Sequence, residues 1–417
     1  MRSPRPQWYG ALGKNARRAF WTSFAGFSLD AMDVQLYAFV LPVLLTAWKL
    51  SHAEAGLLAS ATLVSSAVGG WIVGLLADRF GRVRMLRITI LWLAISTCLC
   101  GLSSNFGQLF AARLLQGLGF GGEWTASAVL LAEIVAPQIR GRVIGMVQSA
   151  WAVGWAMAAA SSAVVFSLAP PDPGWRIAFI VGFVPAILVF LYRTRLEETE
   201  TFRKVKERSS WHAIFSHGMV GKTIKGGLLA TGMHGGYWAI ATWWPVMLGA
   251  ERGFSTTASS AYLGVVAIGS FFGYVSSAWL SDRFGRKATL AGFALCAIAV
   301  VLICTEYPVS NLEMLLLSFP LGFFALGMFS AIGPVLTELY PTETRGSGLG
   351  FCYNFGRGAA GSTPLLIGGS AASIGISHAI GIYVTLAYGL VVVVIAFLPE
   401  TRGQVLKSLS EAESLGS

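Results

Sequence analysis

The chain has 417 residues, of which 55% are hydrophobic and only 12% are charged, and its mean hydropathy is +0.65. A soluble protein cannot bury so much apolar surface in one core, so this composition excludes a soluble protein and indicates a membrane protein. The net charge of +10 raises nucleic acid as a partner, but the positions of the basic residues have a topological explanation. The five cysteines lie in apolar stretches without metal-site or disulfide spacing, so no metal is expected.

One short motif divides the chain into two similar halves. The stretch Leu76–Arg82, LADRFGR, returns as LSDRFGR at Leu280–Arg286, an offset of 204 residues. Six further landmarks keep nearly the same offset, among them Pro42 with Pro245. Because chance does not produce so many matches in order, the chain is predicted to contain two copies of a unit of about 200 residues.

Twelve apolar stretches, six in each copy, are long enough to cross a bilayer as helices. They predict an all-α membrane protein with an N-terminal six-helix bundle over 1–195, a cytoplasmic linker over 196–223, a C-terminal six-helix bundle over 224–398 and a cytoplasmic tail over 399–417. The expected spans are 20–47, 54–77, 85–103, 106–131, 142–168, 175–195, 224–248, 257–280, 288–305, 312–337, 347–372 and 375–398.

The basic residues predict how these spans are oriented. If both termini are cytoplasmic, 25 of the 30 basic residues fall in inner segments, Arg193 among them, while three fall outside and Arg113 and Arg357 lie within spans. Basic loops resist translocation, so this bias predicts cytoplasmic termini and accounts for the net charge without nucleic acid. The basic N-terminus has no cleavage site after it and is interpreted as a cytoplasmic anchor, not a signal peptide.

This pattern resembles the major facilitator superfamily over nearly the whole chain. Besides the repeated loop motif, it includes RLLQG at Arg113–Gly117, PQIRGR at Pro137–Arg142 and PET at Pro399–Thr401. The first loop departs from the family pattern at Val83, where a basic residue is usual. The resemblance implies a monomeric transporter of twelve transmembrane helices in two pseudo-symmetric bundles, located in a bacterial inner (plasma) membrane.

Shorter motifs are similar to those of organic-acid:proton symporters. DAMD at Asp30–Asp33 looks like the Asp-Gly-x-Asp signature of carriers for aromatic acids, nicotinate and sialic acid, with Ala31 in place of the glycine. GGEW at Gly121–Trp124 and QSAW at Gln148–Trp151 are most similar to carriers of sialate and other organic acids, the lactate type included. The resemblance implies proton-coupled uptake of a small organic carboxylate by alternating access, with the proton as coupling ion and no other cofactor.

The repeated loop motif implies a cytoplasmic gate. In the family such residues form charge pairs with the start of helix 11 and nearby helix ends, which hold the inner face shut in the outward-open state. The alternative is that these charges only set the topology. The expected gate residues are Asp78, Arg79, Gly81, Arg82, Asp282, Arg283, Gly285 and Arg286.

Ionisable residues within the spans are candidates for proton coupling. Each costs about 2.5–3.5 kcal/mol to insert, so each needs a partner or a water-filled cavity. Asp30 and Asp33 share one helix face and repel each other, and helix direction brings Arg113 to the depth of Asp33. The expected Arg113–Asp33 pair is a coupling element in the resembled family; a permanent structural salt bridge is the alternative. The candidates are Asp30, Asp33, Arg113, Glu123 and His234.

Two of these candidates keep an alternative reading. Glu123 either carries a proton or is a protonated or hydrogen-bonded residue in helix packing between glycines. His234 corresponds to Asp30 at the repeat offset. It could accept a proton or bind a carboxylate when charged, or it could be a satisfied hydrogen-bonding residue.

Arg357 carries the substrate prediction. It lies near mid-depth in its span, one turn from Asn354, and its guanidinium matches a carboxylate at two points. The anion is Glu123, an aspartate of the first span, or the substrate. Trp155 and Tyr353 are further aromatic candidates for the cavity, although most of the 14 tryptophans are expected to pack or face lipid. The expected substrate-binding residues are Arg357, Asn354, Gln148, Tyr37, Trp151, Tyr237 and Trp238.

Other functions are less well supported by the sequence. A sugar or other neutral-metabolite:proton symporter shares the PET ending and Arg113, but a cavity-facing Arg357 argues against a neutral substrate. A drug/proton antiporter usually has a Gly-x-x-x-Gly-Pro-x-x-Gly stretch in helix 5, and this chain has no proline after Gly154 there. No nucleophile–base pair or phosphate loop supports an enzyme, and no appended domain supports a receptor.

Overall fold

The computed structural model describes residues 7–10, 12–135, 137–198, 214–216, 218–340 and 344–401, and the regular structure in these ranges is helical. After the short α1 (Gln7–Gly10), the helices of the first half form six crossings. The fifth crossing is a pair of consecutive helices interrupted at Ser149. The helices are α2 (Lys14–Ala47), α3 (His52–Phe80), α4 (Arg82–Leu102), α5 (Phe106–Ile134), α6 (Pro137–Gln148) with α7 (Ala150–Leu168), and α8 (Pro171–Arg193).

The second half repeats this order. Its fourth and fifth crossings are interrupted at Leu326–Met328 and at Gly361. The helices are α10 (Val220–Ala250), α11 (Thr256–Phe284), α12 (Arg286–Glu306), α13 (Asn311–Ala325) with α14 (Phe329–Glu338), α15 (Arg345–Ala360) with α16 (Ser362–Ile374), and α17 (Ile376–Ala396). The twelve predicted crossings and the all-α fold are confirmed, although α2 begins at Lys14, earlier than the expected residue 20.

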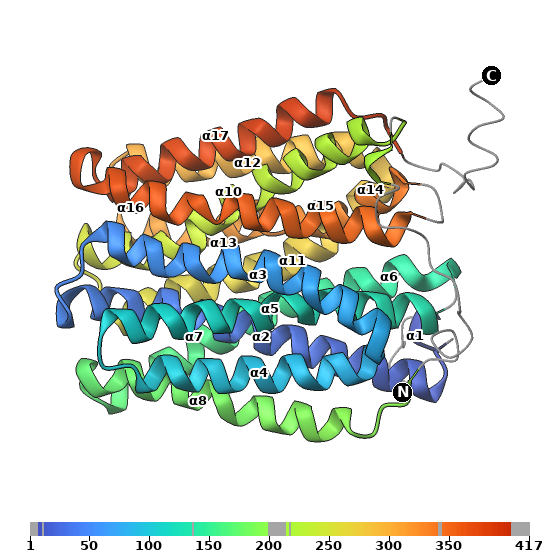
Figure 1. Ribbon diagram of the computed structural model, residues 1–417. Helices are drawn as coiled ribbons and strands as arrows, with labels where there is room; N and C mark the ends of the chain where they lie inside the picture. The colour runs from blue at the N-terminus through green and yellow to red at the C-terminus, as the bar shows by residue number, and fades with distance from the viewer. Residues whose placement is uncertain are drawn as a thin grey trace, which may run out of the picture.

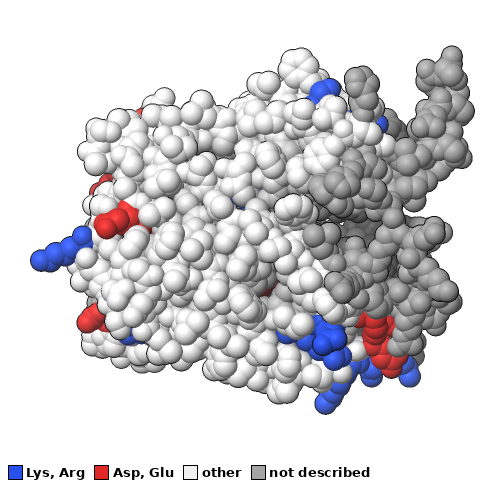
Figure 2. Space-filling model, in the orientation of Figure 1, with Lys and Arg blue, Asp and Glu red and all other residues white. Residues whose placement is uncertain are grey.

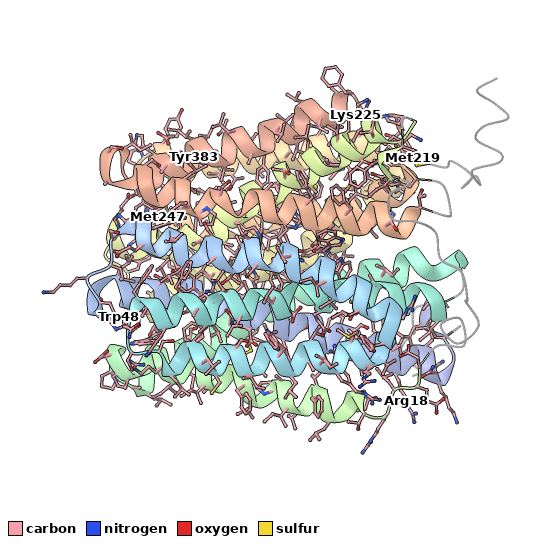
Figure 3. All side chains as sticks on the ribbon, in the orientation of Figure 1. Arg18, Trp48, Met219, Lys225, Met247 and Tyr383 are labelled. Atoms are coloured by element: carbon pink, nitrogen blue, oxygen red, sulfur yellow. The ribbon has the colours of Figure 1, made fainter. Side chains whose placement is uncertain are left out.

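The two halves lie side by side, with the first half in the lower part of Figure 1 and the second half in the upper part. We call the end where α2 begins and α17 ends the inner end, and the opposite end the outer end. Arg18 and Lys225 lie at the inner end, whereas Trp48 and Met247 lie at the outer end (Figure 3). The visible charged side chains gather near the two ends of the molecule, and the middle is largely uncharged (Figure 2).

The surface between the two ends is suited to lipid. Large apolar side chains are exposed there, including Trp71, Leu188, Phe272 and Leu386. Within the described residues, nine segments are long and apolar enough to cross a membrane by length and composition. The expected spans at 106–131, 224–248 and 347–372 are not among these nine. The first of these three spans contains Arg113 and Glu123, the second contains His234, and the third contains Arg357.

The repeated loop motif has the same backbone geometry in both halves. Gly81 and Gly285 have φ values of 104° and 103°, a region that favours glycine, and each stands just before the third helix of its half. The Glu198 carboxylate accepts the Val83 N–H at 3.1 Å. In the second half, Glu400 accepts the N–H groups of Arg286 and Lys287, at 3.0 and 3.1 Å. A carboxylate therefore caps the start of the third helix in each half.

The described gate side chains make contacts within their own halves. Arg286 donates to the Glu338 carboxylate over 3.1 and 3.3 Å, and Arg283 stacks on Trp279. Arg82 is buried and donates to the Ala77 carbonyl at 3.5 Å. The side chains of the other predicted gate residues, Asp78, Arg79 and Asp282, lie outside the described part of the structure. The gating role stays a prediction.

The two halves meet closely at the outer end. A Cβ at Gly56 of α3 would overlap the Pro364 carbonyl of α16, and a Cβ at Gly368 would overlap the His52 carbonyl. The rings of His52 and Trp243 are in edge-to-face contact, with 5.8 Å between their centroids. The outer end is therefore packed shut around the α3–α16 crossing.

Candidate functional site

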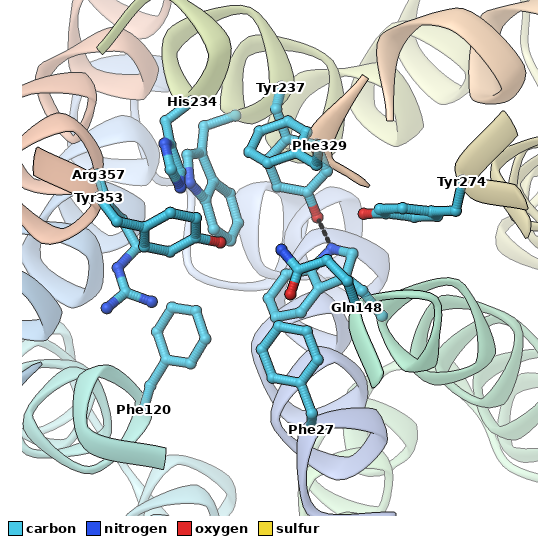
Figure 4. A pocket seen from close by; sticks show the side chains of 11 residues that line it. Phe27, Phe120, Gln148, His234, Tyr237, Tyr274, Phe329, Tyr353 and Arg357 are labelled. Atoms are coloured by element: carbon cyan, nitrogen blue, oxygen red, sulfur yellow. Dashed lines mark hydrogen bonds between the residues drawn. The ribbon is translucent and has the colours of Figure 1, made fainter. Parts of the chain in front are cut away.

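A pocket of about 350 Å³ lies between the two halves (Figure 4). Helices of both halves contribute to it: α2, α5, α6 and α7 of the first, and α10, α11, α14 and α15 of the second. Eight of its eleven lining residues are aromatic, so the chemistry of its wall suits a flat apolar body that a few polar groups would orient. The lining residues are Phe27, Phe120, Gln148, Trp151, His234, Tyr237, Trp238, Tyr274, Phe329, Tyr353 and Arg357.

Arg357 is the cation of this pocket and is only 2% exposed. Its guanidinium lies over the Phe120 ring, 4.6 Å from the centroid. It donates to Asn354 Oδ1 at 2.5 Å and reaches the Gly121 carbonyl at 3.5 Å. No aspartate or glutamate of the described chain forms an ion pair with it, and its Nε has no partner there. Asn354 therefore orients a guanidinium that keeps its charge available for an anion.

His234 and Gln148 are the other strongly polar groups of the pocket wall. His234 Nδ1 lies 2.9 Å from the Ala230 carbonyl of its own helix, and this contact assigns the hydrogen of a neutral ring to Nδ1. The imidazole meets the Tyr353 ring edge to face at 4.7 Å. In Figure 4 the Gln148 amide lies among the aromatic rings.

The Tyr237 hydroxyl connects the two halves. It accepts hydrogen bonds from the indole N–H groups of Trp151 and Trp155 in α7, at 2.7 and 2.8 Å. It donates to Gln35 Oε1 of α2 at 3.4 Å. One phenol of the second half is thus held by two helices of the first half beside the pocket.

The acids of α2 are buried, and neither forms an ion pair within the described residues. Asp30 and Asp33 are both 0% exposed, and within the described residues neither oxygen of Asp30 has a hydrogen-bond partner. Asp33 Oδ2 accepts from the Thr97 hydroxyl at 3.2 Å. Buried carboxylates in this condition are expected to hold protons or to await a cation.

The predicted direct pair between Arg113 and Asp33 is wrong. Arg113 donates to Gln116 Oε1 at 2.5 Å, and Gln116 in turn donates to the Thr97 hydroxyl at 2.8 Å. The same hydroxyl donates to Asp33, so the two charges are linked through two intervening side chains. The physical reason is that the guanidinium stacks over the Tyr37 ring at 4.2 Å, whereas Asp33 turns toward Thr97 of α4 and Gly182 of α8.

Comparison with known proteins identifies the family. Residues 23–303 match the family model described as Major Facilitator Superfamily. The chain belongs to the Major Facilitator Superfamily. Residues 197–412 also match a model described as Sugar (and other) transporter. The chain is therefore a multi-pass membrane transporter and not an enzyme, as the sequence predicts.

Similar transporters cover nearly the whole chain. It is 36% identical to a probable 4-methylmuconolactone transporter of Cupriavidus pinatubonensis, over 98% of this chain and 96% of that one. It is 30% identical to the niacin transporter NiaP of Acinetobacter baylyi, over 95% and 97% of the two chains. The crystal structure of a D-xylose-proton symporter superposes with a TM-score of 0.76 at 19% identity, over 94% of this chain and 99% of that one, which shows the shared fold.

The transporter also contains a buried ion pair near its inner end. Arg193 of α8 donates to Glu123 Oε2 at 2.8 Å and to Oε1 of the same carboxylate, and both side chains are essentially unexposed. Thr89 and Ser127 donate to Glu123 as well, at 3.0 and 3.4 Å. Arg193 also donates to the Leu86 and Thr22 carbonyls. Arg193 ends α8 at the inner end, where it is counted among the inner basic residues, but its side chain turns back into the bundle.

The structure places the predicted substrate residues unevenly. Arg357, Gln148, Trp151, Tyr237 and Trp238 line the pocket. Asn354 lies behind Arg357 as its hydrogen-bond partner, and Tyr37 lies at a smaller neighbouring space. Sequence reasoning missed some aromatic members of the wall, because in the sequence they look like ordinary apolar span residues. The missed residues are Phe27, Phe120, Tyr274 and Phe329.

Proposed function

We propose that this transporter takes up small organic carboxylates together with protons, by alternating access of one central site to the two sides of the membrane. The observation that carries the proposal is Arg357, a buried guanidinium that faces an aromatic pocket between the halves without an ion-pair partner in the described chain. A substrate carboxylate would satisfy this charge, and the aromatic wall would hold its apolar body. The niacin transporter among the relatives fits this chemistry, because niacin is an aromatic carboxylic acid.

Protons are proposed to arrive on the acids of α2, with His234 as a further acceptor. Asp30 and Asp33 are buried with unpaired oxygens, so a proton on either would remove an uncompensated charge from the interior. The Thr97–Gln116–Arg113 chain would pass a change of charge at Asp33 to a guanidinium beside the path from outside. The carrier is proposed to lie in a bacterial cytoplasmic membrane with both termini inside, which the bias of basic residues supports.

Alternating access requires the packed outer end to open. The contacts at Gly56 and Gly368 would have to separate for substrate to reach the pocket from outside. The halves would then close again at the outer end and part at the inner end to release substrate and proton together. The hydrogen bonds of the Tyr237 hydroxyl also join the halves and would have to adjust as the two ends open and close.

A sugar or other neutral metabolite is the second candidate, favoured by the match of residues 197–412 to a sugar transporter model. Uptake into proteoliposomes separates the two functions. We expect accumulation of at least one of labelled lactate, benzoate, nicotinate and sialic acid, greater with an acidic outside than at equal pH and lost with a protonophore. D-xylose should not accumulate or compete. Uptake of xylose alone would reject a carboxylate as the substrate. Acid uptake without pH dependence would reject the proton as the coupling ion.

A further inference from the structure

A second, smaller space of about 240 Å³ adjoins the central pocket. Trp238 lines both spaces. The second space lies nearer the outer end: it contacts Gln35 instead of Phe27 in α2, and Arg113 instead of Phe120 in α5, which runs inward from the outer end. A solute that came from outside would therefore meet this space before the central pocket.

The polar groups of this space are dominated by hydrogen-bond donors without partners. Among the described residues, Arg113 Nε, Gln35 Nε2 and Trp238 Nε1 have no acceptor. All three side chains are at least 96% buried, with exposed fractions of 2%, 1% and 4%. Buried donors cost free energy unless an acceptor meets them, and three around one space define a place for an acceptor.

The charge of this space is positive and is not neutralised at short range. Its described lining contains Arg113 and no aspartate or glutamate. Asp33, the nearest acid in the hydrogen-bond chain, is separated from Arg113 by Gln116 and Thr97. One face of the guanidinium rests on the Tyr37 ring, which leaves its edge for a ligand in the plane. A guanidinium edge with amide and indole donors beside it matches a carboxylate.

We propose that this space is a second anion site, the outer site, in which Arg113, Gln35 and Trp238 hold the carboxylate of an arriving acid before it passes Trp238 to Arg357. The identity of the occupant rests on the proposed function, whereas the affinity for a carboxylate does not. The same donors could hold chloride from the medium. The two sources differ in shape, since a carboxylate offers two oxygens and chloride offers one centre.

Thermal unfolding of the purified full-length protein tests the outer site without any transport. Sodium formate serves as the probe, with formamide as an uncharged probe of similar shape. We expect on the order of 100 mM formate to raise the apparent Tm of Arg357→Gln by about 2 °C, and this shift to vanish in the Arg113→Gln, Arg357→Gln double variant. Lys49→Gln in the Arg357→Gln background removes an exposed positive charge of the outer end and should keep the shift.

Two results of this experiment would overturn the outer site. A double variant that responds to formate as strongly as Arg357→Gln does would show that Arg113 does not hold the anion. An Arg357→Gln variant without any formate response would show that Arg357 is the whole site. Chloride that stabilises Arg357→Gln where formate does not would assign the site to an inorganic anion and reject the carboxylate.

Sided transport tests the place of the site on the path. In oriented proteoliposomes, Arg113→Gln should raise the KM for nicotinate influx about tenfold and leave the KM for efflux unchanged, because the acid meets Arg113 first only from outside. Arg113→Lys should recover part of the loss. Equal effects in both directions would reject a station on the inward path. If wild-type protein carries none of the acids, the proposed function fails, while the formate experiment still decides whether the outer site exists.

Discussion

The buried charges of this transporter fall into two groups that differ in their partners. Near the inner end, Glu123 and Arg193 neutralise each other, and Thr89, Ser127 and two backbone carbonyls add hydrogen bonds, while Arg193 Nε has no partner among the described residues. Three other buried charges, Asp30, Arg113 and Arg357, have no ion-pair partner within the described chain. A charge already satisfied by the protein has little capacity left for a ligand, whereas an unsatisfied charge gains from one.

This difference suggests that the inner ion pair has a structural role and the unpaired charges a functional one. The inner pair fastens α5 to α8 and reaches the backbone of α2 and α4, so it holds the first half together as one body. Of the unpaired charges, Arg113 and Arg357 line the two spaces to which both halves contribute, and there a proton or a carboxylate can change the balance of charge. For Glu123, this contrast favours the packing role over the proton-carrying role.

The largest effect should come from breaking the inner pair on one side. Glu123→Leu leaves the Arg193 guanidinium buried and unpaired, which costs about 3–5 kcal/mol and should remove most folded protein. The Glu123→Leu, Arg193→Leu double variant replaces the whole pair with apolar groups and should recover much of the yield. Monodisperse yield and apparent Tm in detergent measure both effects.

The contrasting result would reassign Glu123. If Glu123→Gln folds normally, keeps binding the substrate and loses the response to the pH gradient, Glu123 carries the coupling proton despite its pair. The distinction between a structural ion pair and functional unpaired charges would then not hold for Glu123.

The second effect concerns the cation of the pocket. Arg357→Lys keeps the positive charge but loses the planar fork, so affinity for a carboxylate should fall about tenfold to a hundredfold, the equivalent of one charge-assisted hydrogen bond. Arg252→Lys is the matched control, since that arginine donates to the Val309 carbonyl away from the pocket. Competition binding against nicotinate measures the change. Unchanged affinity in Arg357→Lys would show that Arg357 does not bind the substrate carboxylate.

Much of the fold could be predicted from the sequence because its signals are local and repeated. The loop motif at Gly81 and Gly285 indicated the duplication. The structure explains why it repeats, because both glycines take nearly the same positive φ before the equivalent helix of each half. Span lengths follow from the thickness of the bilayer. The three spans that fall short of the criterion for length and composition contain Arg113 and Glu123, His234, and Arg357, so part of their polarity comes from polar residues of the interior.

The site was harder to predict because the direction of each side chain decides which buried charges contact each other, and the sequence does not give that direction. Arg193 lies at the end of an apolar span and at the start of a basic stretch, where it is indistinguishable from a charge that sets topology. The signal available in the sequence was Glu123, a buried acid in need of a cation. Arg113 shows the opposite case: helix depth brought it level with Asp33, but stacking on Tyr37 and two intervening polar side chains keep the two charges apart.

A third, smaller effect separates coupling from binding at the acids of α2. Asp33→Asn cannot gain or lose a proton but can still accept from Thr97, so we expect substrate binding to persist. A difference of one pH unit can drive about tenfold accumulation for each proton carried, and this accumulation should disappear in the variant while exchange continues. Asp30→Asn is the companion test. Accumulation that survives in both variants would move the coupling proton to His234 or to another group.

The smallest effect should come from the bridge at Tyr237. Phenylalanine keeps the ring in the pocket wall but leaves the indole N–H groups of Trp151 and Trp155 without their acceptor in the closed outer arrangement. Losing about 1 kcal/mol from one arrangement of the halves shifts their balance about fivefold. Tyr237→Phe should therefore change the turnover rate by a few fold and leave substrate affinity almost unaltered.

The control for this bridge is Tyr274→Phe, because that tyrosine also lines the pocket but has no hydrogen bond to Trp151 or Trp155 in the described contacts. Initial rates and competition binding on the same preparations distinguish the two roles. If Tyr237→Phe weakens binding as much as Arg357→Lys does, the hydroxyl is a ligand of the substrate and not a link between the halves. The unpaired charges would then bind the substrate together with the neutral Tyr237 hydroxyl, a role that neither hydropathy nor ion pairing indicates.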